Sequence, residues 1–289
     1  MPQLRPDRLA TLYFFHPVRR ALSLAAPGIP ILMYHSISRR SENGRSAYYS
    51  TCTDPEVFAE QVRFLARNGY KTIGLGEAVR RLAKAEQHTD RTVVLTFDDG
   101  YGDFYMEAFP VLSRFGYTAT VFLPTGFIGY TEQQFNGMPC LIWSQVRDLY
   151  HAGIDFGSHT VTHPQLRALA NREIEREVRQ SKETIEDKLG TSVDSFSYPY
   201  AFPEADRAFR RTVRGLLEAA GFRSGVSTII GTADRSSDAL LLERLPVNSG
   251  DDAGIFRAKL EGGYDWLHTV QLASKLWAAR MSTARAACN

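Results

Sequence analysis

Short apolar runs alternate along this chain with segments in which apolar residues recur at helical spacing. The run 91–99, RTVVLTFDD, is β-branched and bounded by Asp and Gly, which is typical of a strand. The segment 55–68 follows Asp54, a good N-cap, and begins with Pro55, which indicates a helix. The same pattern predicts strands at 29–37, 70–75, 117–124, 154–157, 195–200, 222–227 and 239–247. It predicts helices at 76–86, 103–115, 143–152, 171–189, 204–220 and 252–283.

Strands that alternate with helices indicate repeated βαβ units and a mostly parallel sheet. About seven such units fit an α/β fold, a distorted (β/α) barrel of about seven strands with helical additions at both termini. No linker rich in Pro, Gly or Ser divides the sequence, and it contains no internal repeat. We therefore expect an N-terminal helical extension over 1–29, a barrel over 30–250 and a C-terminal helical tail over 251–289.

The composition narrows the class of protein. With 44% hydrophobic and 23% charged residues among 289, it is typical of a soluble globular protein. The formal net charge of +2 comes without a long basic run, which argues against a nucleic-acid-binding protein. The three cysteines, Cys52, Cys140 and Cys288, are too scattered to indicate a disulfide framework or a cysteine-rich zinc site.

The N-terminal segment bears on the location of the protein. Charge interrupts it before an apolar core long enough for a signal peptide, and no uncharged apolar run reaches about 18 residues. Cytoplasmic residence is therefore the expectation. Residues 8–24 form an amphipathic pattern in which Arg19 and Arg20 accompany Leu12 and Phe14. A membrane-surface contact and a helix packed on the barrel both fit, and the mixed composition favours the packed helix.

Two adjacent carboxylates, Asp98 and Asp99, end the strand predicted at 91–99 and precede Gly100. Neighbouring side chains of a regular strand point to opposite faces. The sharp turn that glycine permits would let both carboxylates face one site at the strand's carboxyl end. A plain Asp-Gly loop start fits the same residues.

Two histidines, His159 and His163, lie four residues apart just after the strand predicted at 154–157. On a helical turn this spacing places both imidazoles on one side, as two ligands of one cation require. With a carboxylate they would form a facial set that leaves positions open for water and substrate. The alternative is a pair of capping or surface histidines.

Two further strand ends carry candidate groups. Pro199 makes a rigid turn between Tyr198 and Tyr200, and such a turn can present an unpaired backbone N–H to a developing oxyanion. A plain turn with aromatic packing fits the same residues. His35 ends the first strand, where the barrel would make it a candidate acid, although a lone histidine is usually structural.

Taken in order, these segments resemble the motifs of the polysaccharide deacetylases of the NodB-homology group, carbohydrate esterase family 4. TFDDG at 96–100 looks like the first motif, and HTVTH at 159–163 looks like the second. SYPYA at 197–201 is similar to the third. ILMYHSI at 31–37 resembles the first strand of a branch that contains bacterial poly-N-acetylglucosamine deacetylases. The resemblance covers roughly 30–250.

The resemblance implies one divalent metal ion bound by Asp99, His159 and His163. Zinc fits two imidazoles and a carboxylate, and nickel, cobalt and iron also accept them. It further implies that Asp98 is the general base that activates the attacking water. The Tyr200 backbone N–H and the metal would hold the oxyanion.

The resemblance also implies His35 as the general acid that protonates the leaving amine. The implied function is a metal-dependent hydrolase that removes N-acetyl groups from an amino-sugar-containing polysaccharide or glycan precursor. An O-acetyl esterase or a small-molecule amidohydrolase could use the same site. A catalytically inactive glycan-binding module is a third interpretation, which the complete metal set disfavours.

Some residues depart from the family pattern. The third motif normally carries an arginine that orients the base, and Ser197 stands in its place, followed later by Ala201 instead of glycine. Arg244, on a neighbouring predicted strand, would supply the missing cation, but a surface ion pair fits it equally well. His268 is a rival for the acid role, yet it lies in the helical tail, so the strand-end position favours His35.

The segment 125–141 shows no clear periodicity, and we expect it to shape the substrate groove. The aromatic residues of this segment, and Trp143 just after it, would either stack on sugar rings or pack in the core. Of the two, core packing is favoured for Phe127, Tyr130, Phe135 and Trp143.

Overall fold

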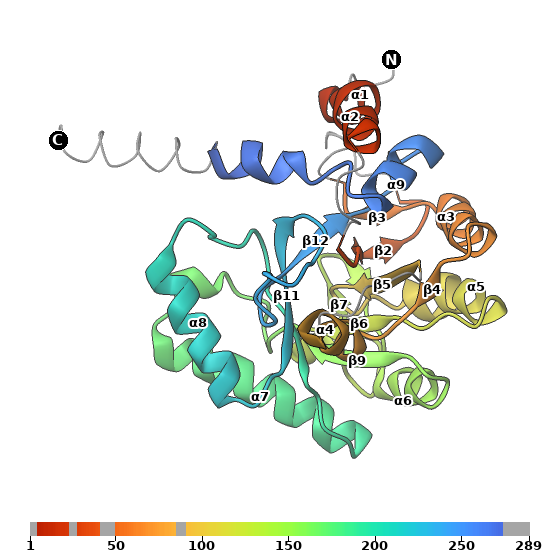
Figure 1. Cartoon of the computed structure of the whole chain (residues 1–289). Coiled ribbons are helices and arrows are strands. Elements are labelled where there is room, and N and C mark those ends of the chain that lie inside the picture. The colour runs from red at the N-terminus through yellow and green to blue at the C-terminus, as the bar shows by residue number, and fades with distance from the viewer. Residues whose placement is uncertain (1–4, 23–27, 41–49, 85–90, 274–289) are drawn as a thin grey trace.

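The structure, a computed structural model, describes residues 5–22, 28–40, 50–84 and 91–273. Within them, the barrel strands are β1 (Ile31–Tyr34), β5 (Thr92–Phe97), β6 (Thr120–Leu123), β9 (Asp155–Ser158), β10 (Ser195–Ser197), β11 (Ser224–Ile230) and β12 (Leu242–Pro246). These strands are parallel and close into a ring in the order β1, β12, β11, β10, β9, β6, β5 and back to β1 (Figure 1). The predicted (β/α) barrel of about seven strands is therefore confirmed.

The helices that accompany the barrel are α3 (Pro55–Arg67), α4 (Leu75–Lys84), α5 (Phe109–Arg114), α6 (Trp143–His151), α7 (Asn171–Leu189), α8 (Arg207–Ala219) and α9 (Ala253–Leu260). A π-helical turn, η2 (Phe104–Ala108), leads into α5. The start of α3 lies where the sequence predicts the beginning of a helix. Asp54 caps it by accepting a hydrogen bond from the Glu56 backbone N–H at 2.8 Å, as its position before Pro55 predicts.

Some predicted strands are shorter than expected. The strand at 29–37 is broken at His35 into β1 and β2 (Ser36–Ile37), and β2 pairs with β3 (Cys52–Thr53). The strand at 70–75 is reduced to β4 (Lys71–Thr72), which pairs with the start of β5. Within 125–141, a small hairpin joins β7 (Gln134–Phe135) to β8 (Met138–Pro139). The hydrophobic pattern does not predict where these strands end or break, because tertiary contacts determine those positions.

The C-terminal helical tail is interrupted. After α9 the chain turns at 261–265 and becomes helical again over 266–273. The rest of the helix predicted at 252–283 lies outside the described residues. Gly262 and Gly263 explain the interruption, since glycine is a poor helix former and Gly262 has a φ of 71°.

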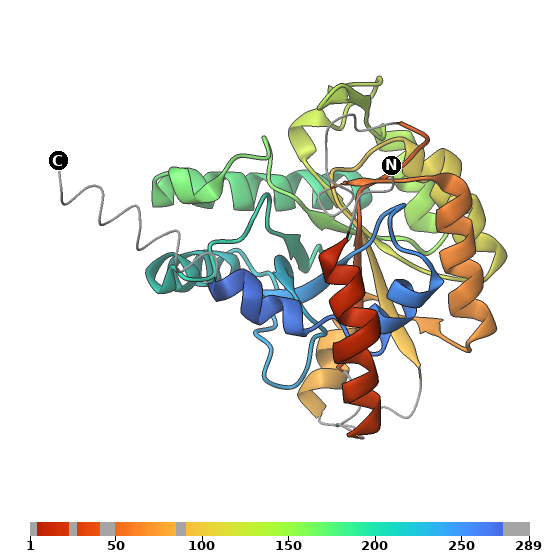
Figure 2. The same ribbon diagram turned by 90° about the horizontal axis from the view of Figure 1, so that it is seen from above.

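At the other end, α1 (Pro6–Ala10), a π-helical turn η1 (Thr11–Phe15) and α2 (His16–Ala21) form one continuous helix, here called the N-terminal helix. It packs beside the C-terminal additions (Figure 2). The Trp266 indole N–H donates to the Thr11 hydroxyl at 2.9 Å, and the Trp266 ring stacks on Phe15 with centroids 4.4 Å apart. Helical additions at both termini are therefore present, and they hold each other against the barrel.

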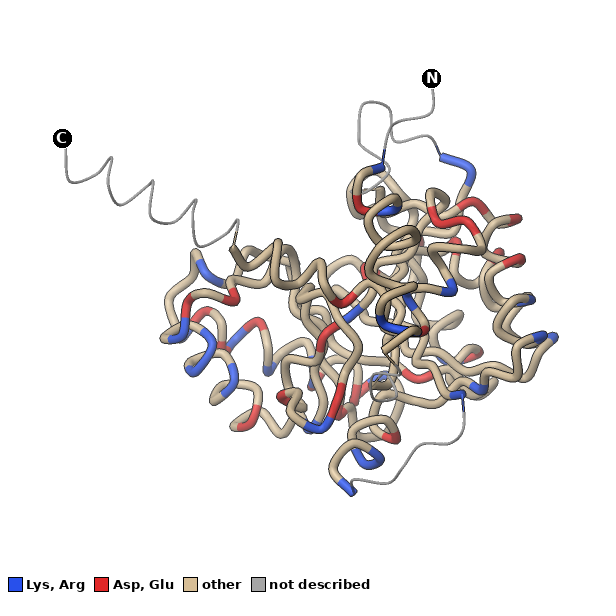
Figure 3. Tube along the Cα trace, turned by 45° about the horizontal axis from the view of Figure 1, so that its top comes forward, with Lys and Arg blue, Asp and Glu red and all other residues tan. Residues whose placement is uncertain are grey.

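Basic and acidic residues are interspersed over most of the trace (Figure 3). This agrees with the near-neutral net charge. None of the helices in the described ranges is long and apolar enough to span a bilayer.

The barrel interior changes from apolar to polar along β5. Side chains of a strand alternate between faces, so Val94, Thr96 and Asp98 point into the barrel in turn. Val94 belongs to an apolar cluster with three residues of α4, which lies across one end of the barrel (Figure 1): Leu75, Ala78 and Leu82. Asp98 therefore lies toward the opposite end, where the strands have their carboxyl termini.

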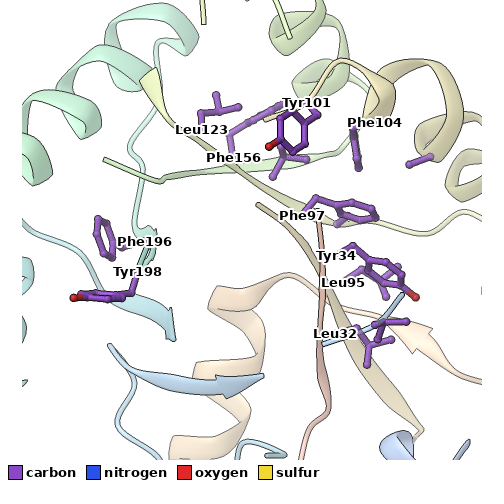
Figure 4. Close-up of a cluster of buried hydrophobic side chains, with 14 of the residues drawn as sticks. Leu32, Tyr34, Leu95, Phe97, Tyr101, Phe104, Leu123, Phe156, Phe196 and Tyr198 are labelled. Carbon is purple, nitrogen blue, oxygen red and sulfur yellow. The ribbon is translucent and has the colours of Figure 1, made fainter. Parts of the chain in front are cut away.

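The main core lies outside the barrel wall, between the strands and the helices (Figure 4). Phe97 is its centre on this side and is 1% exposed. Its ring stacks on Tyr34 with centroids 5.2 Å apart and meets the edges of Phe58 and Phe104 at 5.8 and 4.8 Å. These contacts join two strands, α3 and η2, so the residue before Asp98 is firmly fixed.

Replacing this ring tests how much the core depends on it. We expect Phe97→Ala to lower the free energy of unfolding by about 3–5 kcal/mol, because a large buried cavity would remain. Urea denaturation followed by circular dichroism measures the loss. Phe115→Ala is the control, since Phe115 is 38% exposed, and its loss should stay below about 1 kcal/mol. Equal losses for the two variants would contradict the arrangement.

Candidate metal centre

The candidate residues named from the sequence lie at the carboxyl ends of barrel strands. Asp98 and Asp99 follow β5, and His159 follows β9. His35 follows β1, and Tyr200 lies shortly after β10. In a parallel barrel all these strand ends meet at one rim, which is where such folds carry their active sites.

Three of these side chains converge. Potential ligand atoms of Asp99, His159 and His163 all lie within 4.8 Å of one another, and all three residues are buried. The two imidazole Nε2 atoms are 3.2 Å apart. Asp99 Oδ1 lies 3.5 Å from His159 Nε2 and 3.4 Å from His163 Nε2. Ligands about 2.0–2.1 Å from a tetrahedral ion are separated by about 3.3–3.4 Å, so the three spacings fit a divalent cation.

The protonation of the two histidines also fits. His159 Nδ1 lies 2.8 Å from the Ser197 carbonyl oxygen, to which it donates, so Nε2 is the nitrogen that faces Asp99 and is available to a cation. Burial and the charge of nearby His159 lower the pKa of His163 to about 4, which leaves that imidazole neutral at neutral pH. A metal ligand must be deprotonated. Burial lowers the pKa of His159, but its hydrogen bond with Asp99 and the charges of Asp98 and Asp99 raise that pKa overall, so His159 would give up its Nε2 proton on binding a cation. Two neutral imidazoles and one carboxylate then form a set that zinc, nickel, cobalt or iron accepts.

The backbone of the site adopts a conformation that the sequence did not predict. His159 and His163 are not on a helical turn, and the four-residue spacing therefore brings them together in another way. Thr160 and His163 have left-handed φ values of 68° and 53°. Asp99 and Tyr200 also have left-handed φ values, of 70° and 60°. In the described part of the chain, Asn136 is the one other non-glycine residue with a positive φ. Such conformations are costly and persist where surrounding contacts impose them.

One of these contacts comes from Glu177 on α7. Its carboxylate is 5% exposed and accepts hydrogen bonds from the backbone N–H groups of Val161 and Thr162 at 2.8 and 2.9 Å. It also accepts one from the Thr162 hydroxyl at 2.9 Å. Glu177 thus fixes the loop between the two histidines. A charged residue inside an amphipathic helix gives no sequence signal for this role.

Asp98 is held by a buried arginine. Arg244, 1% exposed, donates from Nη1 to Oδ1 at 2.8 Å and from Nη2 to Oδ2 at 2.7 Å. The Ser197 hydroxyl donates to Oδ1 at 3.1 Å. Burial alone would raise the pKa of Asp98, but the charge of Arg244 and its hydrogen bonds hold that pKa well below its usual range. Of the two interpretations of Arg244, the surface ion pair is therefore wrong.

The substitution at Ser197 also has a structural explanation. Its hydroxyl accepts a hydrogen bond from Arg244 Nη2 at 3.2 Å while it donates to Asp98. The guanidinium thus reaches Asp98 from β12 and contacts Ser197 of β10. The same residue orients His159 through its carbonyl. Arg244 thus contacts Asp98, as expected of an arginine that supplies the cation missing at position 197.

The two candidate acids lie in different surroundings. His35 Nε2 is 3.9 Å from Asp98 Oδ2, and the side chain is 21% exposed, so it borders the site and solvent. His268 Nε2 lies 2.6 Å from Glu204 Oε1 and contacts none of the site residues named above. The structure brings His35, and not His268, to the rim.

Aromatic rings line the cluster. Tyr200 and Phe135 lie against His163 with centroids 4.6 and 5.0 Å away. Phe135 and Trp143 are buried, and Phe127 packs partly buried against the same core, so these aromatics do pack, as favoured from the sequence. Tyr130 differs, because it is 71% exposed.

The backbone N–H of Tyr200 is also available to bind a ligand. In the described part of the chain no protein acceptor receives its N–H, while its carbonyl oxygen accepts from the Thr228 hydroxyl at 3.4 Å. Its left-handed φ turns this peptide away from the direction that an extended continuation of β10 would give it. An N–H without a protein partner is available to a ligand.

Comparisons with known proteins agree on one family. A family model described as polysaccharide deacetylase matches residues 85–225. The Bacillus subtilis (strain 168) protein YxkH, which carries the same family name, is 30% identical over 233 residues, or 81% of this chain and 76% of the relative. The poly-beta-1,6-N-acetyl-D-glucosamine N-deacetylase of Staphylococcus aureus (strain N315) is 22% identical over 205 residues, 68% of this chain and 67% of the relative. Among solved structures, the Streptococcus pyogenes deacetylase PplD in complex with acetate has a TM-score of 0.71 and 25% identity, covering 82% of this chain and 100% of that one.

The metal centre can be tested by counting bound ions. We expect His163→Ala to lose the divalent ion that the unchanged protein retains, because one of three ligands is removed. His268→Ala is the matched control, since His268 lies outside the cluster, and it should bind as much metal as the unchanged protein. Elemental mass spectrometry after dialysis against cobalt or zinc gives the ratio of metal to chain. Equal metal content in both variants would rule out this site.

The Arg244–Asp98 pair predicts a non-additive effect on stability. Arg244→Met should lower the free energy of unfolding of the metal-free protein by about 3–5 kcal/mol, because Asp98 would remain charged and buried. Adding Asp98→Asn should recover part of this loss, since the uncompensated charge is gone. Arg214→Met, which alters an exposed ion pair with Asp238, is the control and should cost about 1 kcal/mol or less. Strictly additive losses in the double variant would contradict the coupling.

Proposed function

The chain belongs to the polysaccharide deacetylase family, and we propose that it is a metal-dependent hydrolase that removes N-acetyl groups from an amino-sugar glycan. The observation that carries the proposal is the convergence of Asp99, His159 and His163 at tetrahedral spacing, with Asp98 next to them. The Staphylococcus aureus relative is named for poly-β-1,6-N-acetyl-D-glucosamine. That name supports N-acetylglucosamine as the sugar of the substrate.

The metal would supply one part of the chemistry. A divalent cation held by Asp99, His159 and His163 would polarise the acetyl carbonyl and lower the pKa of a water molecule at the site. The protein residues account for the proton transfers. Asp98 accepts the proton of the attacking water while Arg244 keeps the carboxylate ionised and oriented. A carboxylate with so low a pKa is a weak base, so this arrangement suits only a water molecule that has itself become acidic.

His35 completes the proton transfers in the proposed mechanism. Its Nε2 is 3.9 Å from Asp98 Oδ2, so base and acid face the same space from β5 and β1. His35 gives its proton to the departing nitrogen, and each such partner typically contributes about 10²–10⁴-fold to the rate. The Tyr200 N–H donates to the oxyanion, and losing such a donor costs about 3 kcal/mol of transition-state stabilisation.

The presence of this acid favours an amide substrate over an ester. An amine is a poor leaving group and must be protonated as the C–N bond breaks, whereas an alkoxide leaves more readily. An O-acetyl esterase would therefore depend less on His35. An inactive glycan-binding module would have no use for a buried carboxylate held by a buried arginine beside the metal ligands.

Acetate release from β-1,6-linked N-acetylglucosamine oligomers tests the proposal. We expect release by the metal-loaded protein, and a rate about 10²–10⁴-fold lower for Asp98→Asn with its metal content unchanged. Asp187→Asn is the control, because that carboxylate is exposed on α7, and it should react at the normal rate. Release from O-acetylated sugars alone would favour the esterase. Normal turnover by Asp98→Asn would show that the base is assigned wrongly.

A further inference from the structure

The N-terminal helix presents an apolar outer face. Ten large hydrophobic residues are exposed in the described part of the chain, and five of them belong to this helix and the residue after it: Leu9 (41%), Tyr13 (75%), Phe14 (59%), Val18 (40%) and Leu22 (63%). A sixth, Val270 (51%), is on the helical segment 266–273 that packs beside it (Figure 2). The remaining four belong to separate elements elsewhere. Single exposed hydrophobic residues are common, but such a concentration on one face indicates an interaction surface.

The inner face of the same helix is already occupied. Thr11 and His16 are buried, and His16 Nε2 lies 2.8 Å from Glu261 Oε2. Arg5, at the start of the helix, pairs with the buried Asp251 at 3.2 Å. Packing on the barrel therefore explains only one face. The packed-helix interpretation therefore holds for the inner face and leaves the outer face without a protein partner among the described residues.

Basic residues outnumber acidic ones on the N-terminal helix and the residue before it, which carry Arg5, Arg8, Arg19 and Arg20 against Asp7. No Asp or Glu occurs in the sequence between Arg8 and Glu42, and none follows Asp265. Arg20 is exposed and makes no ion pair with the described residues, whereas Arg8 pairs with Asp252 at 2.6 Å and Arg19 donates to the Glu261 carbonyl oxygen at 3.1 Å. Elsewhere on the trace the two signs are interspersed (Figure 3). A helix with a net positive charge and an exposed apolar face complements an anionic surface with an apolar interior.

We propose that this face docks on the surface of an anionic phospholipid bilayer, with the N-terminal helix lying in the plane of the interface. Tyr13 and Phe14 would enter the boundary between headgroups and acyl chains, and Arg20 would contact the phosphates. A symmetric contact with a second copy would instead bring the two sets of arginines together, since such an interface pairs each patch with itself. A bilayer satisfies both the apolar and the basic residues.

Docking in this way would also set the position of the metal centre. Arg5 donates to the Gly250 carbonyl oxygen at 2.6 Å, and Gly250 lies shortly after the carboxyl end of β12. The start of the helix is therefore at the rim that carries the metal ligands. The rim would be held close to the membrane surface.

Vesicle flotation with the full chain tests the proposal. One set of vesicles contains phosphatidylcholine with phosphatidylglycerol, and the other contains phosphatidylcholine alone. We expect the unchanged protein to float with the anionic vesicles. The double variant Tyr13→Ser/Phe14→Ser should bind these vesicles more weakly by a factor of about ten or more. Met106→Ser/Tyr130→Ser is the matched control, because these side chains are 66% and 71% exposed outside the helix, and its binding should be unchanged.

A second variant changes only the charge of the face, so that a loss of vesicle binding cannot be explained by a loss of packing or stability. Arg20→Glu should weaken binding to the anionic vesicles about fivefold or more and leave the melting temperature unchanged. Failure of the unchanged protein to float, or an equal loss in the Met106/Tyr130 control, would overturn the proposal. So would a dimer in sedimentation equilibrium that Tyr13→Ser/Phe14→Ser converts to a monomer, because the face would then cover a second copy.

Discussion

The guanidinium of Arg244 is buried inside the barrel, where a charge of either sign is unfavourable unless it is paired. Its partner Asp98 is 3% exposed, so each charge makes the burial of the other tolerable. Asp98 directly precedes Asp99, and Ser197 binds Asp98 through its hydroxyl and His159 through its carbonyl. The positions of Asp99 and His159 are therefore tied to this pair, while Glu177 fixes the loop that leads to the third candidate ligand, His163.

Much of the barrel could be predicted from the sequence, because the local signals agree with the final fold. The apolar run before Asp98 forms β5, and the 19-residue helix α7 has the predicted bounds of 171–189. The break at His35 could not be predicted, because it depends on which strand lies alongside, and periodicity within a segment carries no such information. The interruption after α9 did have a local signal, Gly262 and Gly263, which the prediction of one continuous helix over 252–283 did not take into account.

The candidate site shows the same division. Residue types and spacing pointed to Asp99, His159 and His163 as candidate metal ligands, and the structure does bring these three side chains together. The reason given for the spacing was wrong, because left-handed turns and not a helix bring the imidazoles together. The role of Glu177 could not be predicted from the sequence. It accepts hydrogen bonds from backbone N–H groups, and such contacts leave no pattern in the residue types.

The left-handed residues at the site imply an evolutionary trade-off. Glycine adopts positive φ without strain, so glycine at position 99 or 163 would relax the backbone. Selection cannot take that route where the side chain is itself a ligand. The strain must then be tolerated, and stability lost at the rim has to be recovered in regions such as the aromatic cluster around Phe97. Substitutions that weaken this core would therefore reduce the range of changes that the metal centre can accept.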